Sequence, residues 1–421
     1  MIPIALAFST FLLILSVPIF LVFGVGSALI ASTDLNLPWA TLLQISFSAV
    51  TKQILLAIPL FIFAGYIMVK GGIATRLVNF CVTLVGHWPG GLGVSMVLAM
   101  GFFAAFCGSV LAAITAIGTV LMPRMVEEGY PKPFIVVLAA MAALLEGLIP
   151  PSNAAIIYSS LTSVPVSRTF AAGIIPGIVL MVLLSAYVAW RCRHMPRATR
   201  ATMEERWHGF VVAIPALLTP FIILGGIYTG LLTATESAAA AGVWSLLIGF
   251  LVYRELTFRG CIEALVATTI ASSAIFVIIG MATFLSVVLT FTQAPQHMID
   301  VLTHMGTGPI TFLVMVAITC LLLGTFIEVV PIFYLILPMT LAALVPLGVD
   351  PIHYYIVLTA FIGLGMLTPP VCVGLYTGAA VIGLSPEKTF RELPGFLLLG
   401  IIYGLLMILL PSLATWLPGH V

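Results

Sequence analysis

The sequence predicts an all-α membrane protein that crosses the bilayer many times and is built from two halves related by an inverted repeat. Of its 421 residues, 62% are apolar, whereas a soluble domain averages about 45–50%. Only 7% are charged, which is too few to cover the surface of a water-soluble protein of this size. In addition, features of the first half recur in the same order in the second half. These observations exclude a water-soluble enzyme.

The amino-acid composition narrows the class of protein further. The 37 Gly and 27 Pro suit membrane helices that bend or break. A net charge of +1 provides no basic surface for nucleic acid. The six Cys form no CxxC pair, so neither a zinc site nor a disulfide framework is indicated. No A-x-A cleavage site closes the first apolar run, which we interpret as a true span.

Apolar stretches of about 20 residues mark the expected spans. There are nine, at about 4–30, 44–69, 134–161, 170–190, 209–229, 236–253, 262–290, 353–380 and 394–415. Two more stretches, about 91–125 and 310–345, are too long for one crossing and have small or helix-breaking residues near their middle. We interpret both as re-entrant hairpins. The alternative is a pair of full spans joined by a very short turn.

Lys and Arg indicate the orientation, because they concentrate on the cytoplasmic side. Residues 191–206 contain five Arg and are expected in the cytoplasm. If residues 72–86 form an arm along the membrane interface, thirteen of the fifteen basic residues lie inside. This predicts a cytoplasmic N-terminus and a periplasmic C-terminus.

Five features recur at an offset near 215–220 residues. They are a glycine-hydroxyl hairpin tip (Gly108-Ser109; Gly324-Thr325), a proline late in the hairpin (Pro123; Pro338), a double proline (Pro150-Pro151; Pro369-Pro370), Thr-Phe (Thr169-Phe170; Thr389-Phe390) and Pro-Gly (Pro176-Gly177; Pro394-Gly395). An arm also precedes each hairpin, at 72–86 and 294–306. The distribution of Lys and Arg indicates that the first hairpin opens to the cytoplasmic side and the second to the opposite side. The repeats are therefore inverted.

Inverted repeats with discontinuous helices are typical of secondary transporters, whose binding sites lie near the bilayer midplane. A channel needs no such pairing. An enzyme needs a catalytic constellation, and the sequence contains no HExxH, GxSxG or DxxxD motif. The expected domains are 1–90 (scaffold helices and first arm), 91–190 (first half of the transport domain), 191–309 (cytoplasmic linker, scaffold helices and second arm) and 310–421 (second half of the transport domain).

The double prolines suggest cation sites. Each removes backbone donors and frees carbonyls, which are costly in hydrocarbon unless they face protein, water or an ion. Hard cations prefer such oxygen ligands. The candidate ligands are Ser109, Leu148 and Pro150 for one ion, and Gly324, Gly365 and Thr368 for its mirror image. Alternatively, the prolines only kink packed helices.

The hairpin tips also present helix N-termini, which attract anions. No Lys or Arg lies in the apolar parts of the hairpins or in the broken helices. A carboxylate substrate would therefore meet backbone N–H groups, the cations and the side chains of Ser109, Thr115, Ser152, Asn153, Thr325 and Thr368.

Acidic residues inside membrane segments are functional candidates. Glu146 precedes the first double proline and Glu328 follows the second tip. Each is either functional or a neutral carboxyl bonded to a freed backbone group. Glu236 fits a capping box with Thr233, and Glu263 is expected to reach the interface at the inner end of a span.

Six sequence motifs run through nearly the whole chain. They are AIPLFIFAGYIM (57–68), GSVLAAITAIGTVLMPRM (108–125), LIPPS (148–152), GLLTATESAAAAG (230–242), GTFIEVVP (324–331) and MLTPP (366–370). With these motifs in this order, the chain resembles the large membrane subunit of tripartite ATP-independent periplasmic (TRAP) transporters, the DctM-like subunit.

The resemblance implies an elevator mechanism, Na⁺ coupling with the ligands named above, and location in the bacterial inner membrane. It also implies a small four-helix membrane subunit and a periplasmic binding protein that delivers an organic acid. Because the chain begins almost at once with a family-like span, the small subunit is expected to be a separate protein. The alternative is a stand-alone Na⁺ symporter of a related elevator fold, of the divalent-anion type, without a binding protein.

Three residues depart from the family pattern. Glu328 stands where Asp is usual, and Leu145-Glu146 stands where Gly and an apolar residue are usual. A carboxylate beside the expected cavity argues against a simple dianionic substrate. We hypothesise that Glu146 either contacts a positively charged part of the substrate or takes up a proton.

Overall fold

The computed structural model describes residues 8, 11–12, 15, 17–33, 35, 38–195, 197 and 199–421. Within these ranges the chain forms helices joined by turns and short loops, without any β-strand. Helices satisfy their backbone hydrogen bonds within one segment, as apolar surroundings require. The predicted all-α fold is confirmed.

The first half contains the predicted hairpin, broken helix and following helix. Its helices are α2 (Ile19–Thr33), α3 (Trp39–Val50), η1 (Gln53–Leu56), α4 (Ala57–Lys70), α5 (Ile73–Val85), α6 (Gly91–Cys107), α7 (Val110–Glu127), α8 (Lys132–Ala142), α9 (Leu145–Leu148), α10 (Asn153–Leu161) and α11 (Val166–Arg191). The α6–α7 pair is the first hairpin. The α8–α9 segment and α10 form the first broken helix, with a bend of 41° between its two parts.

The second half repeats this order. Its helices are α12 (Met203–Tyr228), α13 (Ala234–Leu247), the π-helix η2 (Ile248–Val252), α14 (Phe258–Phe291), α15 (Ala294–His304), α16 (Pro309–Gly324), α17 (Val329–Leu344), α18 (Pro351–Leu367), α19 (Val373–Val381), η3 (Pro386–Thr389), α20 (Leu393–Leu409), α21 (Ser412–Thr415) and η4 (Pro418–His420). The α16–α17 hairpin, the α18–α19 broken helix and α20 correspond to α6–α7, α8–α10 and α11. Both predicted arms are helices, α5 and α15.

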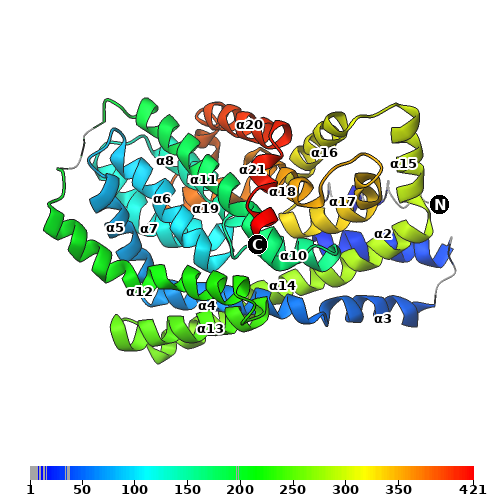
Figure 1. The fold of residues 1–421 in the computed structure, drawn as a ribbon, viewed down its shortest axis with the longest axis horizontal. Helices are drawn as coiled ribbons and strands as arrows, with labels where there is room; N and C mark the ends of the chain where they lie inside the picture. Colours follow the sequence, from blue (N-terminus) through cyan, green and yellow to red (C-terminus); the bar gives the residue numbers. More distant parts are fainter. Residues whose placement is uncertain are drawn as a thin grey trace.

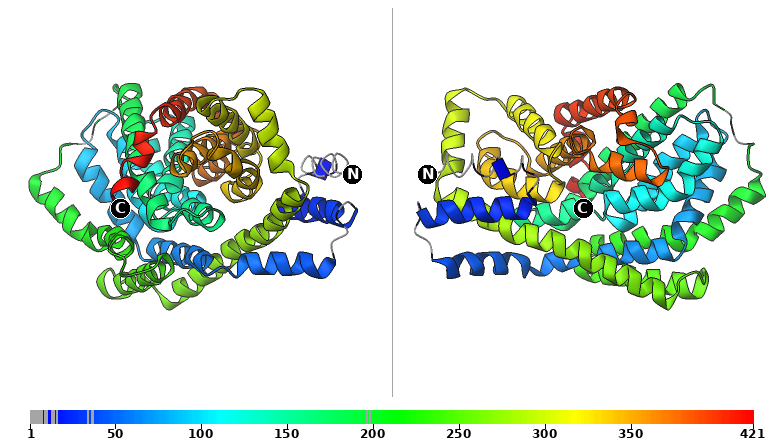
Figure 2. Two further views of the ribbon diagram at one scale, coloured as in Figure 1. Left: turned by 45° about the vertical axis from the view of Figure 1, so that its right-hand side comes forward. Right: turned by 180° about the vertical axis from the view of Figure 1, so that it is seen from behind.

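The helices form two layers (Figure 1). Long helices α2, α3, α4, α13 and α14 lie together along one side, with α14 packed on α2, α3 and α4, and α13 on α4. The hairpins and broken helices stack on the other side of α4 and α14, as two further views also show (Figure 2). Contacts of α4 with α6 and of α14 with α17 join the layers.

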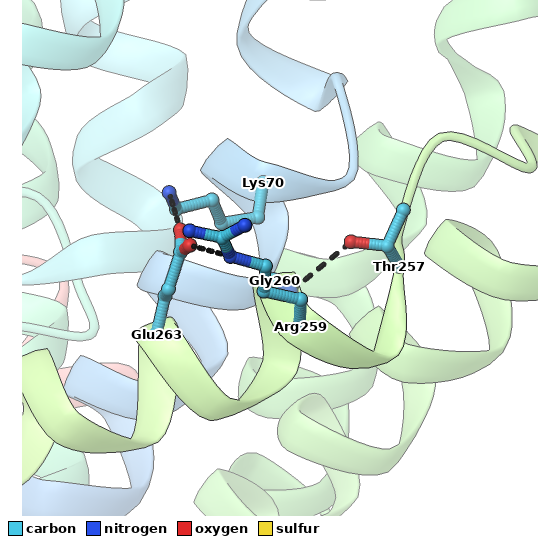
Figure 3. Close-up of polar contacts among 5 residues, drawn as sticks. All are labelled: Lys70, Thr257, Arg259, Gly260 and Glu263. Atoms are coloured by element: carbon cyan, nitrogen blue, oxygen red, sulfur yellow. Dashed lines mark hydrogen bonds and ion pairs between the residues drawn. The ribbon is translucent and has the colours of Figure 1, made fainter.

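A charged cluster joins α4 to the beginning of α14 (Figure 3). Glu263 accepts a hydrogen bond from Lys70 Nζ at 2.7 Å and one from Arg259 Nε at 3.1 Å. Thr257 caps α14, because its Oγ1 accepts a hydrogen bond from the N–H of Gly260 at 3.1 Å. Glu263 was expected to reach the membrane interface. In the structure its carboxylate forms ion pairs at the end of α4 and the beginning of α14.

The count of membrane spans differs from the prediction. Among the described residues, six helices are individually long and apolar enough to cross a membrane, or eight if each bent pair is one span. One of the six is α7, an arm of a hairpin. Of the nine expected spans, 4–30 lies partly outside the described residues, and 353–380 consists of α18 and α19, separated at the double proline as predicted.

The expected span 44–69 is also divided, which corrects the prediction of one helix. The chain leaves α3 after Val50 and restarts as η1 at Gln53, with an extended Lys52 between them. The Lys52 ammonium group donates a hydrogen bond to the carbonyl of Ser160 at 2.8 Å. The Lys52 side chain, at the break between α3 and η1, thus bonds to the last turn of α10. Apolar composition alone does not indicate this break.

The N-termini of the apolar helices α12 and α13 are defined by local chemistry. The predicted capping box at α13 is confirmed: Thr233 Oγ1 accepts from the N–H of Glu236, and the Glu236 carboxylate accepts from the N–H of Thr233. A second capping box, Thr202 with Glu205, begins α12. These reciprocal bonds satisfy N–H groups that have no partner within the helix.

Candidate functional site

A cavity of about 330 Å³ lies between the two layers. Both hairpin tips, the first break, α4, α14 and α18 contribute to its wall. The lining residues are Ile62, Tyr66, Gly108, Ser109, Val110, Leu111, Glu146, Gly147, Ser152, Asn153, Ala154, Ala271, Ala274, Ile275, Ile278, Glu328, Val329, Val330 and Met366. Because both tips end at this interior cavity, the hairpins are re-entrant, as predicted.

The first hairpin tip is tied to the first break. Gly108 ends α6 with φ of 62°, a left-handed conformation that glycine adopts without a steric penalty. Its carbonyl accepts a hydrogen bond from Asn153 Nδ2 at 2.8 Å, and Asn153 is the first residue of α10. Ser109, in extended conformation, then begins α7. One side chain thereby holds the tip against the restarted helix.

The first break leaves peptide oxygens outside the helical ladder. The carbonyl of Gly147 accepts two hydroxyl groups, Ser152 Oγ at 3.0 Å and Tyr355 Oη at 3.1 Å. Outside the helices, no described backbone N–H donates to the carbonyl of Leu148 or Pro150. This agrees with the prediction that the double proline frees carbonyls.

The second tip and the second break are also in contact. A Cβ placed on Gly324 would lie 2.9 Å from the Cα of Gly365, so these two backbones touch. The N–H of Val371, just after the second double proline, donates to the carbonyl of Thr325 at 3.3 Å. Both halves therefore join tip to break, although through different groups.

A second, small cavity of about 20 Å³ lies at this contact. It is lined by Gly324, Phe326, Ile327, Glu328, Met366, Val371, Cys372 and Val373. A cavity needs about 10–15 Å³ to hold one water-sized particle, so this one is large enough for a single water or ion.

The structure brings together most of the predicted side chains. Five of the eight predicted substrate-binding residues line the larger cavity: Ser109, Glu146, Ser152, Asn153 and Glu328. Three do not line it: Thr115, Thr325 and Thr368. The hydroxyl groups of these three donate to the carbonyls of Leu111, Leu322 and Leu364 in their own helices.

The predicted cation ligands form two groups. Ser109 lines the larger cavity, whereas Leu148 and Pro150, at the adjacent break, line neither of these two cavities. The carbonyl oxygen of Leu148 lies against Gly173 of α11. Gly324 lines the smaller cavity, in contact with Gly365. Thr368 follows α18 directly, and its N–H donates to the carbonyl of Gly365 at 2.8 Å. That carbonyl keeps one lone pair for a further partner.

Sequence reasoning missed part of the wall. Tyr66 of α4 and the Ala271–Ile278 face of α14 border the cavity. Tyr355 supports the first break from the other half of the molecule through its bond to Gly147. The small Ala271 and Ala274 were the available signal for a face of α14 that leaves space beside it.

The charged side chains that line the cavity are both acidic. Glu146 and Glu328 line it, and its described lining residues include no Lys, Arg or His. Glu146 is only 2% exposed, whereas Glu328 is accessible at the second tip. Neither oxygen of the Glu146 carboxylate has a hydrogen-bond partner among the described residues. The site thus combines two acidic side chains with hydroxyl and amide groups, and its described lining residues include no basic side chain. This arrangement favours positively charged ligands.

The fold is similar to that of a solved transporter structure. It is a crystal structure of the YdaH transporter of Alcanivorax borkumensis, with a TM-score of 0.63 over 88% of this chain and 87% of that one. The sequence identity is 14%, so the likeness concerns the fold alone.

Curated relatives are similar along most of their length. The C4-dicarboxylate TRAP transporter large permease protein of Pseudomonas aeruginosa is 35% identical over 87% of this chain and 86% of its own length. The ectoine/5-hydroxyectoine TRAP transporter large permease protein of Ruegeria pomeroyi is 32% identical over 90% of this chain and 89% of its own length. The sialic acid TRAP transporter permease protein of Haemophilus influenzae is 33% identical over 87% of this chain and 60% of its own length.

A family match covers nearly the whole chain. Residues 5–413 match the family described as the tripartite ATP-independent periplasmic transporter, DctM component. Together with the relatives and the apolar helices, this establishes a multi-pass membrane protein of the large permease type. The chain belongs to the DctM component family of tripartite ATP-independent periplasmic transporters.

Proposed function

We propose that this chain is the membrane-embedded transport subunit of a Na⁺-coupled symporter that imports an organic acid or a related small solute. One observation supports the proposal most strongly: each re-entrant tip is joined to the break of the next helix, through Asn153 and Gly108 in one half and Val371 and Thr325 in the other. Cavities lie at both junctions. The protein acts as a transporter and not as an enzyme.

In the proposed cycle, sodium ions bind to the freed peptide oxygens and offset the charge of the cavity. The first ion is held by Ser109, Leu148 and Pro150, and the second by Gly324, Gly365 and Thr368. Hard cations suit these ligands. One charge that crosses 100 mV changes in energy by about 2.3 kcal/mol, so excess sodium can drive accumulation of the solute.

Movement of the site across the membrane is proposed to follow an elevator mechanism. Residues 91–190 and 310–421 form the moving transport domain, while 1–90 and 191–309 form the scaffold with its two arms. The layered arrangement supports this division, because α4 and α14 separate the hairpins from the other long helices. The opposite orientation of the two halves then exposes the cavity alternately to either side.

The proposed partners are a separate four-helix membrane subunit and a periplasmic binding protein that delivers the solute. The proposed location is the bacterial inner membrane, with the N-terminus in the cytoplasm and the C-terminus in the periplasm. Exposed apolar side chains on α13 and α14, such as Val243, Leu247 and Ile270, suit contact with lipid or with the small subunit.

Uptake into proteoliposomes tests this proposal. The chain, its small subunit and its binding protein are reconstituted, and uptake of labelled succinate, ectoine and sialic acid is measured with an inward gradient of sodium or of choline. The expected result is accumulation of at least one solute with sodium alone. Equal uptake with choline would refute sodium coupling. Full uptake without the binding protein would instead favour a stand-alone symporter.

A further inference from the structure

The buried polar atoms of the larger cavity that lack partners are all hydrogen-bond acceptors. They are both carboxylate oxygens of Glu146 and the side-chain oxygen Oδ1 of Asn153. The orientation of the Asn153 amide follows from its Nδ2 group, which must donate to the carbonyl of Gly108. A ligand that satisfies these atoms must therefore bring hydrogen-bond donors or a positive charge.

The same cavity contains acidic side chains without a basic partner among the described residues. Glu146 is 2% exposed and has no ion pair within the described part of the chain, and the other charged lining residue, Glu328, is also acidic. A buried carboxylate without a partner is strongly disfavoured. A cationic group on the ligand would remove this cost for Glu146.

The first hairpin tip already has a carboxylate beside it. The N–H groups of Gly108 and Ser109 lie close enough to Glu146 to interact with its charge, although neither forms a hydrogen bond of good geometry with it. Such N–H groups at a helix start attract anions. Glu146 thus places negative charge where a second carboxylate of a dianionic substrate would otherwise be favoured.

We propose that Glu146 recognises a cationic nitrogen of the transported solute, so that the substrate is a small zwitterion with an N–H-bearing ammonium or amidinium group. This inference rests on the proposed transport function. The N–H groups of the cation donate to Glu146 and to Oδ1 of Asn153, while Glu328 adds long-range attraction. Charge-assisted bonds of this kind are about twice as strong as neutral ones.

Two other ligands would also satisfy the carboxylate of Glu146. A sodium ion would coordinate the same acceptors, and a proton would neutralise Glu146 directly. The three ligands predict different effects of removing the Glu146 charge. A cationic solute predicts changed solute selectivity, sodium predicts changed sodium affinity, and a proton predicts a changed pH dependence, so the test has to measure all three.

The test measures uptake of four labelled solutes into proteoliposomes that contain the reconstituted assembly. Ectoine and γ-aminobutyrate carry an N–H-bearing cation, γ-butyrobetaine carries a cationic nitrogen without N–H, and succinate carries no cation. The expected wild-type preference is for ectoine or γ-aminobutyrate over both of the others. Preference for succinate, or absence of uptake of both N–H-bearing solutes, would overturn the inference.

Three variants test whether Glu146 determines this solute selectivity. Glu146→Gln should lower kcat/KM for the preferred solute by about 100-fold, the size expected when one partner of a buried charge pair is lost. Glu146→Asp keeps the charge and should retain the preference with a smaller loss. Glu127→Gln removes an exposed carboxylate at the end of α7 in the same hairpin and should have no effect. The melting temperature of each purified variant, measured without sodium or solute, identifies correctly folded protein.

The alternatives have distinct outcomes. If Glu146→Gln changes the sodium concentration at half-maximal uptake or the pH profile, but leaves the solute preference intact, the inference is overturned. If succinate uptake requires sodium and no cationic solute is transported, the proposed symport stands and this inference fails. If N–H-bearing solutes are preferred but sodium is irrelevant, the inference stands and the symport proposal fails.

Discussion

Gly324 and Gly365 lie backbone against backbone where the second hairpin tip meets the second broken helix. A Cβ on Gly324 would lie 2.7 Å from the carbonyl oxygen of Ile362 and 2.9 Å from the Cα of Gly365. Real Cβ atoms do not approach backbone this closely. This contact is one of the two that bring a re-entrant tip to a break, and it permits only glycine.

We expect Gly324→Ala to displace the second hairpin. The added methyl group must push α16 away from α18, and overpacking of this kind costs about 1–3 kcal/mol. The melting temperature of the purified protein should fall, and solute uptake should be lost. Gly225→Ala is the matched control, because a Cβ at this helical position meets open space. Unchanged uptake by folded Gly324→Ala would contradict the importance of this contact.

The equivalent junction in the first half depends on a side chain. Asn153→Ala removes the hydrogen bond to Gly108 and leaves the carbonyl of that residue without a partner, which costs about 1–3 kcal/mol. We expect the uptake rate at low solute concentration to decrease at least tenfold. Asn79→Ala, which removes only a surface contact with Arg124, should have little effect. Similar uptake by the two variants would show that the Asn153 bond does not position the tip.

The capping box of α13 gives a prediction about stability alone. Thr233→Ala removes the acceptor of the Glu236 N–H and should lower the free energy of unfolding by about 1 kcal/mol. Thr233→Ser keeps a hydroxyl group and should recover most of the loss. Thermal unfolding of both variants in detergent measures the difference. Equal destabilisation by Ala and Ser would mean that the threonine methyl group, not the cap, is important.

Much of the fold was predictable, because its main features are encoded locally. Gly108-Ser109 marks a hairpin tip and Pro150-Pro151 a break, since left-handed backbone and missing donors restrict what the chain can do. The capping box at Thr233 is equally local. The recurrence of these features in the same order in both halves then predicted which tips and breaks would correspond.

The remaining features depend on contacts distant in sequence. The division of the expected span 44–69 involves the bond from Lys52 to Ser160, more than one hundred residues away. The hydroxyl of Tyr355 that supports Gly147 comes from the opposite half of the chain. Thr115 was predicted in the cavity from its residue type and proximity to the tip, but it is exposed and bonded within α7. Sequence shows which groups are available, but not which face each helix turns inward.

Sodium binding at equilibrium tests the central claim most directly, namely that the two tip–break junctions hold coupling cations. Purified protein is titrated with ²²Na⁺ in choline chloride of constant ionic strength, without solute. The account predicts saturable binding that choline does not displace and that Gly324→Ala weakens while Gly225→Ala does not. Sodium binding no greater than the nonspecific background, in protein that is folded and transports its solute, would contradict it.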